Sequence, residues 1–248
     1  MTGLLASELR RLISRRLVKV VVGLAILAVI VASVIVLLTQ HYEIAGLAGV
    51  IKGTSLAFVA IGWVIGASSV GADWHAGVMT TILTWEPRRA RVIWTKVAAC
   101  LGSVFVLTLI VQALLAGLLA VAAALTGSTA GADGTSFVET AAVAFRSAVL
   151  ASFCAGLGFG IASIGRNTAA ALGVGFGYML IVENVVRGLK PEWAPWLLTD
   201  NAAMFIVNER AAFPQLGRGV VGTGLYLAAL TGVLLFAAAT SFRSRDVT

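Results

Sequence analysis

Two histidines and two cysteines are the side chains in this sequence best suited to binding a metal ion or assisting nucleophilic catalysis. Both cysteines, Cys100 and Cys154, lie within long apolar stretches, where we interpret them as small apolar core residues. The histidines, His41 and His75, flank an apolar stretch long enough to cross a membrane, so we expect them on opposite sides of it. We therefore predict no metal site and no catalytic constellation, and we expect that the chain is not an enzyme.

Glu183 is an acidic residue within an apolar run, 168–187. A charge at the bilayer centre costs about 2.5–3.5 kcal/mol on insertion scales, and intramembrane acids are biased toward functional roles. Arg187 follows four residues later, so one interpretation is a local ion pair that points outward. The other interpretation is that Glu183 and Asn184 face a polar path or a second subunit. Both stay open at the level of sequence.

The composition is that of a membrane protein. Of 248 residues, 59% are hydrophobic and 12% are charged, whereas an ordinary soluble domain has roughly 45–50% apolar and about 25% charged residues. A transmembrane helix needs about 20 apolar residues, and stretches of that length recur along the whole chain. We predict an all-α polytopic membrane protein of one permease-like domain, 1–248, with six transmembrane helices. The predicted spans are 18–39, 54–72, 95–126, 143–165, 168–187 and 219–242.

Basic residues between the predicted spans set an orientation. The formal net charge is +7, but these residues do not form the single clustered face that binds nucleic acid. With the N-terminus in the cytoplasm, twelve of the 18 Lys and Arg residues lie inside and six lie outside or near the outer boundary. This asymmetry satisfies the positive-inside rule. We expect no nucleic-acid partner and a multi-pass protein of the cytoplasmic membrane, with both termini in the cytoplasm.

Residues 1–17 precede the first span and have an amphipathic pattern. Leu5 and Leu9 recur at helical spacing with further apolar residues, while Glu8 and Arg11 take the other side. We expect an interfacial helix whose arginines lie at anionic lipid headgroups. A frayed, positively charged flank of the first span is the alternative.

The segment 188–217, before the last span, mixes aromatic and polar residues. Trp193 and Phe205 lie there with Glu192 and Asp200, a mixture that belongs at membrane interfaces. We expect one or two short helices in or on the outer leaflet, and an ordinary interfacial loop is the alternative.

The segment 71–96, GADWHAGVMTTILTWEPRRARVIWTK, is a polar interruption on the predicted cytoplasmic side. Trp74, Val78 and Ile82 have helical spacing, and Pro87 stops the helix soon after them. The pattern predicts a short helix on the membrane surface that is tied at both ends to transmembrane helices. A force on this helix would reach the second and third spans together.

The same segment resembles the inner-loop signature of the type-2 ABC-transporter permeases. Six spans, an N-terminal interfacial helix and a long outer segment before the last span also fit that family, so the resemblance covers essentially the whole chain. Two positions depart from the signature, since Asp73 takes a place often held by Glu and Val78 one often held by Thr. The residues that carry the resemblance are Asp73, Gly77, Leu83, Glu86, Pro87, Arg88, Arg89, Arg91 and Lys96.

The resemblance implies the membrane subunit of an ATP-driven ABC exporter. In that family the inner-loop helix docks onto a separate ATP-binding subunit, and two permease chains form the translocation path. This chain has no GxxxxGK[ST] phosphate-binding loop, so it would bind no cofactor, and the partner subunit would hold ATP and Mg²⁺. Glu183 and Asn184 become candidates for the path or the dimer interface. The candidate coupling residues are Asp73, Trp74, Gly77, Leu83, Glu86, Pro87, Arg88, Arg89 and Arg91.

The family also implies a hydrophobic or amphipathic substrate, such as a drug, a peptide antibiotic or a lipid. Two other functional classes stay open at the level of sequence. A stand-alone secondary transporter predicts inverted repeats and ionisable residues near the midplane, and the two halves of the sequence show no convincing repeat. A non-transporting scaffold that assembles other membrane proteins is the third class.

Overall fold

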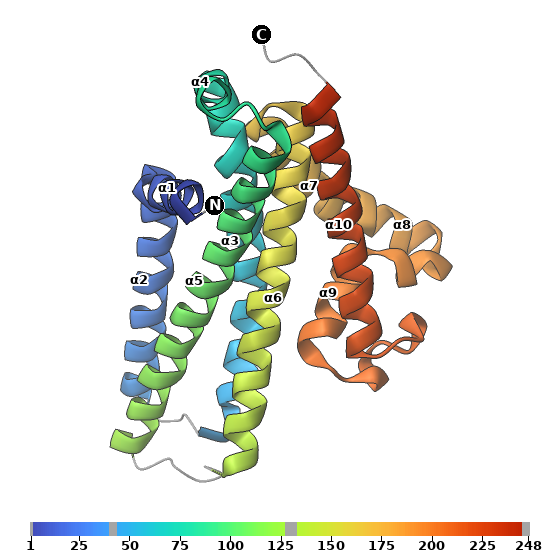
Figure 1. Ribbon diagram of the computed structural model, residues 1–248. Helices are drawn as coiled ribbons and strands as arrows, with labels where there is room; N and C mark the ends of the chain where they lie inside the picture. The colour runs from blue at the N-terminus through green and yellow to red at the C-terminus, as the bar shows by residue number, and fades with distance from the viewer. Residues whose placement is uncertain (1, 40–43, 127–132, 245–248) are drawn as a thin grey trace.

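The computed structural model describes residues 2–39, 44–126 and 133–244, and within these ranges the chain is helical and has no strand (Figure 1). It contains six helical segments that are long and apolar enough to cross a membrane. The prediction of an all-α polytopic membrane protein is confirmed. His41 lies outside the described residues. The six segments are Arg16–Leu38, Leu47–His75, Arg89–Leu125, Gly134–Gly165, Thr168–Leu189 and Val220–Ser244.

Five of these segments are single helices, and the fifth in chain order is interrupted by a π-helical turn. Four spans begin earlier than predicted, at residues 16, 47, 89 and 134 instead of 18, 54, 95 and 143. Lys52 and Glu139 therefore lie inside helices, and they form an ion pair at 2.9 Å. The spanning helices are α2 (Arg16–Thr39), α3 (Leu47–His75), α5 (Arg89–Thr126), α6 (Gly134–Gly165), α7 (Thr168–Gly177) with the π turn η2 (Tyr178–Val182) and α8 (Glu183–Leu189), and α10 (Val220–Ser244).

Two further helices, α1 (Thr2–Ser14) and α4 (Val78–Trp85), lie at one end of the bundle, which we name the α4 end (Figure 1, top). α1 runs across the start of α2, and α4 contacts α3 and α5. The last turns of α2 and α5 and the first turns of α3 and α6 lie at the opposite end.

An acidic cap begins α6. The carboxylate of Asp133 accepts hydrogen bonds from the backbone N–H of Ser136 at 2.8 Å and from its hydroxyl at 2.7 Å, which is an N-cap arrangement. The hydroxyl and then the N–H of Ser136 lower the pKa of Asp133 to about 2. Because the pKa falls on folding, the cap contributes its full stabilisation at neutral pH and loses it only as the pH falls toward 2.

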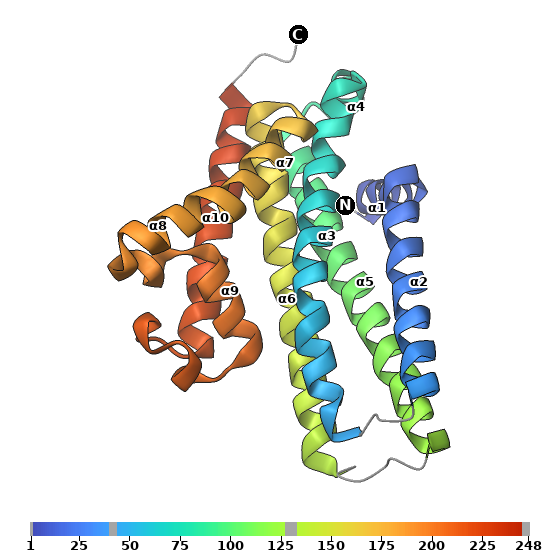
Figure 2. The ribbon, with the colours of Figure 1, turned by 180° about the vertical axis from the view of Figure 1, so that it is seen from behind.

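The centre of the bundle is the contact between α3 and α6, which lie side by side in Figure 1 and Figure 2. In the most apolar stretch of each helix 67% of the residues are buried, against 11% in α2. Two glycines of α3 permit this approach, because a Cβ at Gly62 would overlap the backbone of Ala151 and one at Gly66 that of Ala155. Small residues are the expected packing device where lipid gives helices no hydrophobic reason to associate.

Replacing Gly66 with alanine should destabilise the protein, because the added methyl group overlaps backbone atoms that cannot rotate away. Overpacking of this kind costs about 1–3 kcal/mol. Gly53→Ala is the matched control on the same helix, since a Cβ at Gly53 meets nothing within 4 Å. We expect Gly66→Ala, but not Gly53→Ala, to lower the midpoint of unfolding in an SDS titration. Equal midpoints for the two variants would contradict the close contact.

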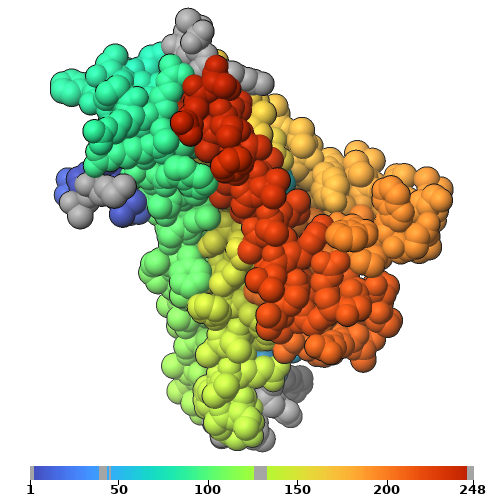
Figure 3. Space-filling view, turned by 45° about the vertical axis from the view of Figure 1, so that its right-hand side comes forward, coloured from blue at the N-terminus to red at the C-terminus, as the bar shows by residue number. Residues whose placement is uncertain are grey.

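The segment between α8 and α10 folds back toward the bundle. Its one α-helix, α9, packs alongside α10, and Figure 3 shows this part of the chain projecting from the side of the molecule. The short helix predicted in 188–217 is thus present as α9, whereas the rest of the segment forms 3₁₀ turns. These elements are η3 (Pro191–Trp196), α9 (Leu198–Val207), η4 (Arg210–Ala212) and η5 (Pro214–Leu216).

Candidate functional site

A sharp turn joins α3 to α4. α3 continues through His75, and the backbone N–H of Gly77 donates to the carbonyl of Trp74 at 3.2 Å. Gly77 has a φ of 65°, in the left-handed region that favours glycine, and it turns the chain into α4. The prediction that Trp74 shares a short helix with Val78 and Ile82 is wrong, because this turn ends one helix and begins another.

α4 buries one face and exposes the other. Met79 and Ile82 are buried against the bundle, whereas the side chain of Trp85 is 85% exposed. The helix ends at Trp85, shortly before Pro87, as the sequence predicted. A large, exposed aromatic side chain on a short, well-anchored helix is the kind of residue that dominates protein interfaces.

A groove of about 520 Å³ runs between α4 and α1. The α1 wall is polar at its centre, with Ser7 and Arg11, and the α4 wall is formed by Thr81, Ile82 and Trp85. The two helices therefore present one continuous surface, although they are far apart in the sequence.

Only some of the predicted coupling residues are exposed on the surface of the protein. Asp73 is 4% exposed, and its carboxylate points into the protein. Trp74 is half-buried, with its ring 5.8 Å from that of Phe242 and beneath the guanidinium of Arg166 at 4.4 Å. Asp73 is therefore not exposed for docking and Trp74 is exposed only in part, because α3 extends past both and turns them toward its neighbours. A role of either residue in coupling stays a prediction. Leu83 packs against the core, while Gly77, Trp85, Pro87 and Arg88 are exposed.

The predicted arginine cluster after α4 has three different environments. Arg88 is exposed. Arg89 begins α5 and donates a hydrogen bond to the carbonyl of Arg243 on α10 at 3.4 Å. Arg91 forms an ion pair with Glu86 at 3.1 Å, which closes the connection between α4 and α5. Of the three, Arg88 is the residue best placed to meet a partner.

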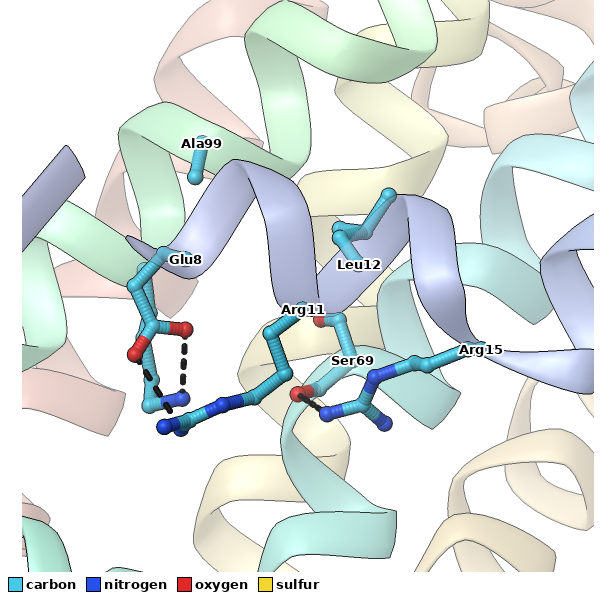
Figure 4. Close-up of a pocket in the computed structure, with 7 residues that line it drawn as sticks. Glu8, Arg11, Leu12, Arg15, Ser69 and Ala99 are labelled. Carbon is cyan, nitrogen blue, oxygen red and sulfur yellow. Dashed lines mark hydrogen bonds and ion pairs between the residues drawn. The ribbon is translucent and has the colours of Figure 1, made fainter. Parts of the chain in front are cut away.

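A buried ionic cluster joins α1, α3 and α5 close to this surface. Lys96 of α5 is 4% exposed, and its Nζ lies 2.8 Å from Oε2 of Glu8 and 2.6 Å from Oδ2 of Asp73. Arg11 adds a second partner for Glu8 at 3.3 Å, and Figure 4 shows the two side chains meeting below α1. Both buried carboxylates of this cluster, those of Glu8 and Asp73, therefore face at least one cation, which offsets the cost of burying their charge.

Arg15 extends the cluster to the backbone of α3. It lies at the break between α1 and α2 and donates hydrogen bonds to the carbonyls of Ser68 at 2.6 Å and Ser69 at 3.0 Å. Figure 4 shows the second of these bonds. Its guanidinium also lies 2.6 Å from Oδ1 of Asp73. Arg15 therefore points into the protein and not toward lipid headgroups, because it pairs with the buried Asp73. The side chain of Arg11 is 37% exposed, so its place at the headgroups stays a prediction.

Glu183 contacts a partner that neither of the two sequence interpretations predicted. Its carboxylate is fully buried and accepts hydrogen bonds from the backbone N–H of Leu198 at 2.7 Å and of Thr199 at 3.1 Å. These are the first amides of α9, where a negative charge is stabilising. The expected ion pair with Arg187 is not formed, because Arg187 lies against Asp200 at 2.8 Å instead. A role for Glu183 in a path or dimer interface stays a prediction.

Asn184, the other candidate for the path or interface, is exposed on α8. Its side-chain amide donates to the carbonyl of Leu180 at 2.9 Å, and its oxygen accepts a hydrogen bond from Arg187 at 3.1 Å. Asn184 thus stabilises the helix through these hydrogen bonds, and the outer face of the helix stays available to a neighbouring chain.

Comparisons with known proteins assign no family. The chain matches no protein-family model, and no curated protein is significantly similar to it in sequence. The features of the protein that bear on its function are therefore the surface formed by α1 and α4 and the ionic cluster beneath it.

Proposed function

We propose that this chain is the permease subunit of an ATP-driven exporter of the type-2 ABC class. In this proposal a separate ATP-binding subunit docks on the surface of α1 and α4 and hydrolyses ATP, and a second permease chain completes the translocation path. The observation that carries the proposal is α4 itself. It is a short helix with an exposed tryptophan, held between two spanning helices at the end of the bundle.

α4 is connected to two spanning helices, so a movement of a docked ATP-binding subunit would reach both of them. α4 is joined to α3 through the turn at Gly77 and to α5 through the Glu86–Arg91 ion pair. The neighbouring α1 is joined to the same two helices through Lys96 and Arg15. A displacement of either helix would therefore move α3 and α5 together, which is what a switch between inward-open and outward-open states requires.

An apolar cavity supports the proposed class of substrate. It has a volume of about 400 Å³ and lies between α3, α6 and α9, where its walls include Val59, Leu150 and Ile206. Binding sites for small molecules are typically ~300–1,000 Å³ and mostly apolar. A hydrophobic or amphipathic compound fits such walls better than an ion does.

The proposed orientation places the α4 end in the cytoplasm of the cell, with both termini there. Arg88, Arg89 and Arg243 lie at this end of the helices, and basic residues favour the cytoplasmic side. The proposed location is the cytoplasmic membrane, where ATP reaches a motor bound to α4.

Trp85→Ala tests the docking surface. Loss of a tryptophan that dominates an interface costs about 2 kcal/mol or more, so the Kd of the ATP-binding subunit should rise about thirtyfold and less of it should co-purify. The measurement is the stoichiometry of a Walker-motif subunit, identified by mass spectrometry, in complexes purified in mild detergent from native membranes. Trp193→Ala, which removes an exposed tryptophan from η3, is the matched control and should retain the subunit.

Arg88→Glu is a second test on the same surface. Its side chain is exposed, so charge reversal should weaken docking while leaving insertion and stability intact. The proposal fails if the native complex contains no ATP-binding subunit, or if Trp85→Ala and Arg88→Glu both retain it at the wild-type level.

A further inference from the structure

An apolar groove lies at the α4 end between α1, α2 and α5, on the other side of α1 from the ionic cluster. Its volume is about 750 Å³. α1 closes it at the top with Leu9 and Leu12, and its walls are formed by Val22 of α2 and Val106 of α5. The groove exists because α2 packs mainly against α5 and is otherwise exposed along most of its length.

The groove has the length of one leaflet of a bilayer. Its α5 wall runs from Ala98 to Ile110, and twelve steps of 1.5 Å make this about 18 Å. One leaflet contributes about 15 Å of hydrocarbon, half of the usual 30 Å. An acyl chain that enters at the α4 end is therefore long enough to fill the groove.

The open edge of the groove is positively charged. Lys19 of α2 is the charged residue on the lining, and Arg16 lies three residues earlier on the same face of the helix. Both side chains are exposed, and neither forms an ion pair with any residue that the structure describes. Among the described residues, no acidic side chain lines the groove. This charge complements a phosphate group at the end of an acyl chain.

We propose that this groove binds one anionic phospholipid, with an acyl chain against α5 and the phosphate beside Arg16 and Lys19. A transmembrane helix of another chain fits less well, because α1 lies across the end of the groove and a straight helix that crosses the whole bilayer would collide with it. A lipid in this site would contact α1 and so help to hold it against α2 and α5. This proposal does not depend on the proposed ATP-driven transport.

Two glycines permit a matched test of the groove. Gly102 lines it and Gly117 lies further along α5 outside it, and a Cβ at either position meets nothing within 4 Å. Gly102→Leu should fill the groove, while Gly117→Leu adds the same side chain to the same helix. The purified protein is exchanged into detergent with equal amounts of phosphatidylglycerol and phosphatidylcholine of identical acyl chains, and retained lipid is counted by native mass spectrometry.

We expect the wild type and Gly117→Leu to retain one phosphatidylglycerol per chain, and Gly102→Leu to retain at least about tenfold less. A cation near the membrane surface contributes about fivefold in affinity for an anionic lipid. The double variant Arg16→Gln/Lys19→Gln should therefore bind lipid but lose a preference of about 25-fold over phosphatidylcholine. Arg243→Gln, which removes a cation from α10, should keep that preference.

Equal retention by Gly102→Leu and Gly117→Leu would overturn the site. A wild-type protein without preference for phosphatidylglycerol would overturn the proposed role of Arg16 and Lys19. A change in oligomeric state in Gly102→Leu, with unchanged lipid retention, would show that the groove receives a second chain and not a lipid.

Discussion

Lys96→Met should destabilise the protein by about 3–5 kcal/mol, the cost of breaking a buried ion pair by removing one partner. Methionine fits the space of the lysine stem, so the loss is mainly electrostatic. The variant leaves Glu8 and Asp73 buried without the ammonium group that lies 2.8 and 2.6 Å from them. The free energy of unfolding, measured by SDS titration in mixed micelles, checks the prediction.

The matched control is Lys52→Met. Lys52 also pairs with an acid, Glu139 at 2.9 Å, but the side chain of Glu139 is 53% exposed. Exposed ion pairs contribute about 0–1 kcal/mol, so Lys52→Met should have little effect. A similar loss in both lysine variants would contradict the special position of Lys96.

A double variant separates the loss of packing from the loss of charge. In Glu8→Met/Lys96→Met both members of the pair are apolar, while Asp73 keeps its partner Arg15. Replacing a buried pair by apolar residues is often neutral or stabilising, so the double variant should be more stable than Lys96→Met alone. With Glu8→Met measured as the second single variant, the coupling free energy of this double-mutant cycle gives the strength of the interaction between α1 and α5.

The spanning helices could be predicted from the sequence because each needs only an uncharged apolar run, which is a local property. The ionic cluster could not be predicted from the sequence. Glu8, Asp73 and Lys96 each stand near the end of an apolar run, where a charged side chain that reaches toward water is the usual expectation. Only the packing of α1 against α5 and of α3 beside α5 brings the three together.

The surface helix α4 could also be predicted only in part: its end could be predicted from the sequence, and its start could not. Pro87 marks the end of α4 in the sequence, and the helix ends at Trp85. The start of α4 depends on the backbone conformation at Gly77, and a glycine within a helical pattern does not reveal whether it turns the chain. Trp74 was therefore assigned to the wrong helix, although the apolar spacing around it was correctly recognised.

Glu183→Ala should destabilise α9 and its packing on α10. The carboxylate accepts hydrogen bonds from two amides, those of Leu198 and Thr199, and a hydrogen bond to a charged group contributes about 1.5–3 kcal/mol. We expect a loss of about 3 kcal/mol in total, with faster hydrogen exchange at the amides of α9. Glu192→Ala is the control in the same segment, because its side chain is 61% exposed, and it should change stability by less than about 0.5 kcal/mol.

Glu183→Gln distinguishes a cap from a path residue. Glutamine keeps one side-chain oxygen that can accept from the amide of Leu198, so capping predicts a smaller loss of stability than in Glu183→Ala. If Glu183 acts only by holding α9, export should follow stability across the two variants and recover when folding is restored at lower temperature. If its charge also acts on a transported compound or at a dimer interface, Glu183→Gln should impair export at normal expression and stability. Fifteen residues separate Glu183 from Leu198, so the capping role depends on the return of the chain through η3, and shortening that turn should reproduce the loss seen in Glu183→Ala.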